Sequence, residues 1–207
     1  MRLASTIALL LFGMIGARSA EIRQFDHRTT EKLGNQLVAA SKRADRGVTT
    51  PAKRRAKQTA VAALKTKLFD EVRYEYVVLD DPAGSGFLVY ALAKANRKEE
   101  VITGGHFRVS VSADGSVPAQ IDLLSQLIRT REPRHTLAAI AATQTVGKLP
   151  VETWIYSSDL YEIPMYVVVM ADGSHWAVAN GLIVRINDKE PKKHLDILNK
   201  RAPNVYD

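Results

Sequence analysis

The stretch MYVVVMADGSHWAVANGLIVRI, residues 165–186, alternates apolar runs with two short turns that contain glycine. Asp172-Gly173 and Asn180-Gly181 favour hairpin turns, because these turns require positive φ angles that Gly accepts and that Asp and Asn tolerate. The runs around them have the length and the β-branched composition of strands. This stretch therefore predicts a three-stranded antiparallel meander.

Asp172, Ser174 and His175 lie within four positions of one another in this stretch. These three residue types together resemble a catalytic cluster. The turn accounts for Asp172. Ser174 and His175 are consecutive in a predicted strand, so their side chains point to opposite faces and cannot share a proton. We therefore expect all three residues to be structural.

Strand-like patterns continue upstream. Residues 72–80 and 86–95 are predicted strands separated by the turn DPAGSG, and Asp114-Gly115 predicts another hairpin. Residues 136–147, TLAAIAATQTVG, fit a short helix or a strand, and residues 151–158, VETWIYSS, fit a strand. The pattern predicts an antiparallel meander sheet of about seven or more short strands.

Two helices are predicted before these strands, over residues 29–47 and 49–69. The first ends at Gly47. The second begins with Thr50 as N-cap and Pro51 at the first helical position, where no N–H donor is needed. The fold class is therefore α+β, with two N-terminal helices followed by the antiparallel meander sheet.

The positive charge of the chain is concentrated in these helices. Residues 21–68 carry twelve Lys or Arg against four Asp or Glu, although the net charge of the whole chain is only +7. One interpretation is a solvated helix face packed on the sheet. The other is a surface that contacts anionic lipid headgroups or lipopolysaccharide, with these candidate residues: Lys53, Arg54, Arg55 and Lys57.

Residues 1–19 have the basic start, apolar run and small residues of a signal peptide, with cleavage expected after Ser19. No later segment is apolar enough to span a membrane. The chain has no cysteine, which excludes a lipoprotein anchor, disulfides, thiolate zinc sites and a Cys nucleophile. We expect a periplasmic or secreted protein, for which nucleic acid is not an expected partner.

The composition divides the chain into four segments. Residues 1–19 are the signal peptide and residues 20–70 a basic helical segment, followed by a β-rich domain over residues 71–190 and a polar C-terminal tail over residues 191–207.

Two strand patterns, GGHFRVSVSADGSV (residues 104–117) and the longer stretch from Val151 to Ile186, carry a resemblance. Over about residues 85–186 the chain resembles uncharacterised exported proteins of alphaproteobacteria, especially sphingomonad-like ones. The resemblance implies export and assigns no activity.

One predicted strand face offers a candidate ligand site. An alternating pattern places His106, Arg108 and Ser110 on the face opposite Phe107 and Val109. This row offers donors and no carboxylate, so it favours a phosphate, carboxylate or sulfated group. The other interpretation is a solvent-facing row on a half-buried sheet.

The five histidines lack the i, i+4 or i, i+2 spacing of a metal site, so neither a metal nor a cofactor is expected. The leading hypothesis is a non-enzymatic periplasmic binding or interaction module, whose partner is another envelope protein or an anionic lipid surface. Two alternatives are a hydrolase with a site assembled from distant residues and an envelope-associated protein held by charge to anionic lipid.

Overall fold

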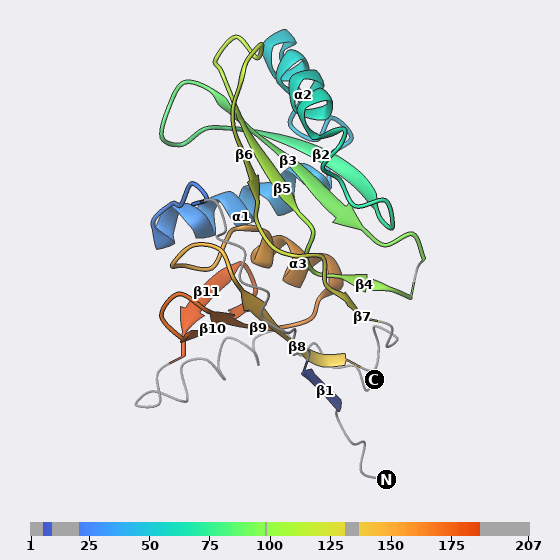
Figure 1. Cartoon of the computed structure of the whole chain (residues 1–207), viewed down its shortest axis with the longest axis vertical. Coiled ribbons are helices and arrows are strands. Elements are labelled where there is room, and N and C mark those ends of the chain that lie inside the picture. The colour runs from blue at the N-terminus through green and yellow to red at the C-terminus, as the bar shows by residue number, and fades with distance from the viewer. Residues whose placement is uncertain (1–5, 10–20, 98, 131–136, 187–207) are drawn as a thin grey trace. The chain divides into compact units, whose positions relative to one another are not determined.

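The structure is a computed structural model that describes residues 6–9, 21–97, 99–130 and 137–186 (Figure 1). These residues form two compact units. One unit comprises residues 6–9, 21–34 and 137–186, and the other comprises residues 35–97 and 99–130. Most of the predicted signal peptide and the whole predicted C-terminal tail lie outside the described residues.

The unit of residues 35–130 contains a four-stranded antiparallel sheet with the order β2-β3-β5-β6. A two-stranded sheet of β4 and β7 accompanies it. The bounds are β2 Arg73–Asp80, β3 Phe87–Lys94, β4 Val101–Ile102, β5 Phe107–Val111, β6 Pro118–Leu123 and β7 Arg129–Thr130. The predicted α+β class, with two N-terminal helices before an antiparallel sheet, is confirmed.

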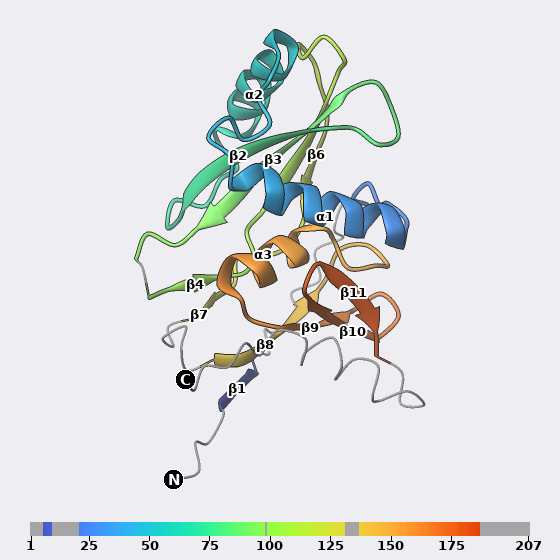
Figure 2. The same ribbon diagram turned by 180° about the vertical axis from the view of Figure 1, so that it is seen from behind.

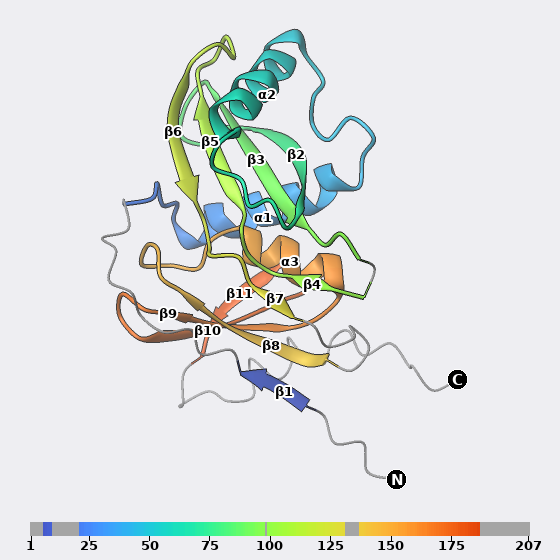
Figure 3. The same cartoon turned by 45° about the vertical axis from the view of Figure 1, so that its right-hand side comes forward.

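The two predicted helices are α1, His27–Ser41, and α2, Pro51–Leu64. Thr50 caps α2, because its hydroxyl accepts a hydrogen bond from the backbone N–H of Lys53 at 3.2 Å. Helix α2 lies against the sheet (Figure 3). Its buried residues Ala56, Ala60 and Leu64 belong to one apolar cluster with these residues of β5: Phe107, Val109 and Val111.

The other unit contains a five-stranded sheet with the order β1-β8-β9-β10-β11. The bounds are β1 Thr6–Leu9, β8 Leu137–Gln144, β9 Met165–Val169, β10 Ser174–Ala179 and β11 Leu182–Arg185. The antiparallel meander of β9, β10 and β11 is confirmed, and both of its turns use positive φ: 68° at Gly173 and 78° at Gly181. The sequence pattern around residues 137–144 fitted either a short helix or a strand, and these residues form strand β8.

The predicted strand at residues 151–158 is wrong, because this segment contains most of helix α3, Thr153–Tyr161 (Figure 2). Strands β8 and β9 are parallel, and a parallel pair requires a crossover connection. The aromatic and β-branched residues here are typical of strands, but Thr153 to Ser158 are all buried rather than alternating. The expectation of purely antiparallel strands is therefore also wrong for this sheet.

The edge of β2 is covered by the loop between α1 and α2. Arg46 has a φ of 48° and Gly47 a φ of 82°. This conformation lets the Arg46 carbonyl accept a hydrogen bond from Val78 N–H at 3.0 Å. A Cβ on Gly47 would lie 2.0 Å from the Val78 carbonyl oxygen, so only glycine allows this close approach.

We expect Gly47→Ala to destabilise the protein much more than Gly173→Ala. Both glycines have positive φ, which costs an alanine about 1–2 kcal/mol. The Gly173 site has no atom within 4 Å of an added Cβ, whereas Gly47→Ala also forces a clash with β2. Urea denaturation of the two variants measures the difference, and equal losses would contradict the close approach at Gly47.

Candidate functional site

The predicted ligand row on β5 lies in the interior of the sheet. His106 is fully buried, and the exposed fractions of Arg108 and Ser110 are 1% and 6%. The expectation of a solvent-facing row is wrong, because β5 lies between β3 and β6 and both of its faces are buried. Phe107 and Val109 do lie on the opposite face, as the alternation predicted.

Arg108 forms an ion pair with Asp122, which is directly opposite it on β6. The Arg108 Nη2 and Nε atoms lie 2.7 and 3.2 Å from Asp122 Oδ2, and Gln120 Nε2 donates to Asp122 Oδ1 at 2.7 Å. The row itself contains no carboxylate, as predicted, but a carboxylate of the neighbouring strand already binds Arg108. The charge of Arg108 is compensated by a carboxylate from the neighbouring strand.

No local pattern marks Asp122 as the partner of Arg108, because a bulge changes the strand register between them and the turn. Near the Asp114-Gly115 turn Val111 pairs with Pro118, but Ser110 pairs with Gln120. Counting back from the turn without the bulge would place Ile121 opposite Arg108. The extra residue brings Asp122 to that position instead.

The imidazole of His106 is buried and acts as a hydrogen-bond acceptor. Its Nδ1 accepts a hydrogen bond from the backbone N–H of Ala93 at 3.0 Å. Burial lowers the pKa of His106 to about 3, because the interior disfavours the charged imidazolium. The imidazole is therefore neutral at neutral pH.

We expect Asp122→Leu to destabilise the protein by about 3–5 kcal/mol, because it leaves the buried Arg108 charge without its carboxylate. The double variant Arg108→Met/Asp122→Leu removes both charges and is expected to recover much of that loss. The free energies of unfolding of Asp122→Leu, of Arg108→Met and of the double variant, each compared with wild type, measure the coupling between the two residues. Additive losses would contradict a coupled ion pair.

We also expect His106 to make stability depend on pH. Its folded pKa lies below the value of about 6.5 for an unfolded histidine, so the unfolded state takes up the proton first as the pH falls. Wild-type stability should therefore drop relative to His106→Gln below pH 6.5, by about 1.4 kcal/mol per pH unit. This loss should continue until the pH nears the folded pKa.

The matched control for this pH experiment is His175→Gln, because the His175 side chain is exposed on β10. Urea titrations from pH 7 to pH 4.5 compare the three proteins. A wild-type curve parallel to that of His106→Gln would show that His106 does not contribute to the pH dependence.

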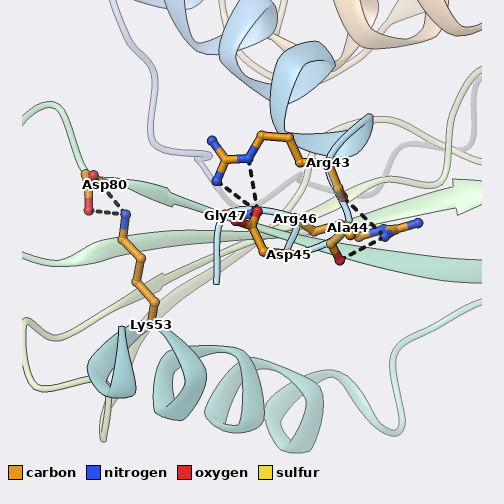
Figure 4. A network of polar contacts seen from close by, with 7 residues as sticks. All are labelled: Arg43, Ala44, Asp45, Arg46, Gly47, Lys53 and Asp80. Atoms are coloured by element: carbon orange, nitrogen blue, oxygen red, sulfur yellow. Dashed lines mark hydrogen bonds and ion pairs between the residues drawn. The ribbon is translucent and has the colours of Figure 1, made fainter. Parts of the chain in front are cut away.

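The four candidate cations of α2 fall into two groups. Lys53 Nζ lies 2.8 Å from Asp80 Oδ1, and Arg55 Nη1 donates to the Asp114 carbonyl at 3.2 Å (Figure 4 shows the Lys53 pair). Within the described part of the chain, Arg54 and Lys57 form neither an ion pair nor a hydrogen bond through their side chains. The Arg54 side chain is exposed, whereas Lys57 is half-buried.

The loop before α2 adds cations that sequence analysis did not include in the candidate site. Arg43 Nη2 lies 2.8 Å from Asp45 Oδ1, and Arg46 Nε lies 2.8 Å from Glu75 Oε1 (Figure 4 shows the Arg43 pair). Burial raises the pKa of Glu75, but hydrogen bonds from Arg46 and Lys94 outweigh this effect and lower it overall. The loop charges are thus largely compensated within the unit.

The residues of the opening stretch occupy the places that the strand pattern predicts. Ser174 is buried and His175 is exposed, as expected for consecutive strand residues. Asp172 Oδ1 accepts a hydrogen bond from the backbone N–H of Ser174 at 2.9 Å, which stabilises the turn. This hydrogen bond accounts for the aspartate without a catalytic role.

Neither a group of three metal-ligating side chains nor a helix long and apolar enough to cross a membrane occurs among the described residues. Comparison of the chain with protein-family models, curated proteins and solved structures gives no match.

Proposed function

We propose that this protein is an exported, non-enzymatic binding or interaction module that acts in the periplasm or outside the cell. Its contact surface is the basic face of α2, which we define as Arg54, Arg55, Lys57 and Lys65. The ligand is an anionic lipid surface of the envelope. The observation that carries the proposal is that Arg54, Arg55 and Lys65 are exposed on a helix whose other face is buried, with Lys57 half-buried at the border of that face.

The packing of α2 fixes this orientation. Ala56, Ala60 and Leu64 are fully buried, so the opposite side of the helix faces outward. Arg54 and Lys65 are eleven residues apart, which is close to three helical turns, and therefore point in the same direction. Val61 lies between them on the outward side with an exposed fraction of 40%.

The charge distribution of α2 favours an anionic partner. The first turn contains no acidic residue, and Lys53, Arg54 and Arg55 lie near the positive end of the helix dipole. Cations at this end of a helix are unfavourable. Anionic headgroups close to the basic face would offset both the repulsion among the cations and their interaction with the dipole.

The test is binding to vesicles of phosphatidylglycerol and phosphatidylcholine at increasing salt concentration. We expect wild-type protein to bind at low salt and to be released as salt screens the charges. Arg54→Gln/Lys57→Gln should weaken binding by about 10- to 30-fold, since each basic residue near an anionic surface contributes about 1 kcal/mol.

The control variant Lys32→Gln/Lys148→Gln removes the same charge from exposed residues outside α2. It should bind the vesicles nearly as well as wild type. Equal weakening by both variants would indicate a response to net charge alone and would contradict a specific basic face. Failure of wild type to bind at low salt would contradict the lipid surface as ligand.

A further inference from the structure

The edge of β8 is paired with a segment of the predicted signal peptide. Strand β1, Thr6–Leu9, pairs in parallel with β8 and is the outermost strand of its sheet (Figure 3). If residues 1–19 are removed on export, β8 becomes the edge strand. Its outward N–H and C=O groups then lack the hydrogen bonds that β1 supplies.

Strand β8 differs from the other sheet edges in the described chain. The β2 edge is covered at Val78 by the Arg46-Gly47 loop, and β6 begins with Pro118. Strand β11 has only four residues and carries Arg185. By contrast, β8 has eight residues, LAAIAATQ, without a charge or a proline. Such an edge can accept another strand.

The backbone hydrogen bonds of β8 show which groups face this edge. Ile140 N–H donates to the Pro164 carbonyl on the β9 side, at 3.0 Å. Successive residues of a regular strand point their N–H groups in opposite directions, so the N–H group of Ala141, which pairs with Leu9, points to the β1 side. Thr143 points the same way, beyond the residues that pair with β1, and the register between the two strands shifts between Leu137 and Ile140. Ala141 thus supplies an outward donor that is exposed at the edge after β1 is removed.

We propose that the exported protein binds an extended, uncharged, apolar segment of a partner polypeptide along β8, in the parallel direction. The argument for this occupant is that the segment TIAL, of the same chemistry and direction, lies there in the full-length chain. Backbone hydrogen bonds would provide affinity, as in strand addition to exposed sheet edges. The inference rests on the export in the proposed function, but not on the basic face of α2.

The test uses protein purified after export, whose N-terminus is established by sequencing. The probe is a fluorescent peptide of sequence STIALL, residues 5–10, with two lysines added at each end. Ala141→Pro removes one outward N–H and should weaken peptide binding by about five- to tenfold. Ala138→Lys places a charge beside the same edge at an exposed position and serves as a second variant if Ala141→Pro does not fold.

The matched control is Leu182→Lys, which adds the same charge to β11 at the opposite edge of this sheet. It should bind the peptide like wild type, and a chain that retains residues 1–19 should bind more weakly because β1 competes. Arg54→Gln/Lys57→Gln should bind the peptide normally even if it loses vesicle binding.

Three results would overturn the proposal. The first is an exported protein that does not bind the peptide, and the second is equal weakening by Leu182→Lys and Ala138→Lys. The third is concentration-dependent dimerisation that Ala138→Lys abolishes, measured by sedimentation, because it would make a second copy the occupant. An N-terminus that still begins at Met1 on exported protein would instead refute the cleavage on which the inference rests.

Discussion

The need to pair backbone N–H and C=O groups at sheet edges governs much of this structure. The β2 edge donates its Val78 N–H to Arg46, and this contact is possible only because Gly47 has no side chain. The parallel pair β8–β9 needs a crossover, which α3 supplies. The same requirement makes β8 the edge whose pairing depends on whether the N-terminal segment is retained.

A second constraint is that the buried charges of the four-stranded sheet are compensated within it. Asp122 pairs with Arg108 inside the sheet, and Arg46 and Lys94 both contact Glu75 in a largely buried position. A buried charge without such a partner would carry a large desolvation cost. Arg54, by contrast, is exposed on the outside of α2, where water or an anionic surface can solvate it.

The sequence Ala-Asp-Gly-Ser occurs at residues 113–116 and again at residues 171–174. Comparing the two shows which structural features such a local motif determines. Asp114 accepts a hydrogen bond from Ser116 N–H, and Asp172 accepts one from Ser174 N–H. The turn chemistry is therefore the same. The hairpins belong to different units, and the strands before them differ: β5 is buried on both faces, whereas β9 alternates between buried and partly exposed residues.

Local sequence was enough to predict the turns at Gly173 and Gly181, the start of α2 at Thr50, and the opposite faces of Ser174 and His175. Each of these features depends on backbone preferences within a few residues. The helix at residues 153–161 and the burial of Arg108 opposite Asp122 could be established only from the folded arrangement. These outcomes depend on strand neighbours and on a bulge, which bring together residues whose pairing no local pattern encodes.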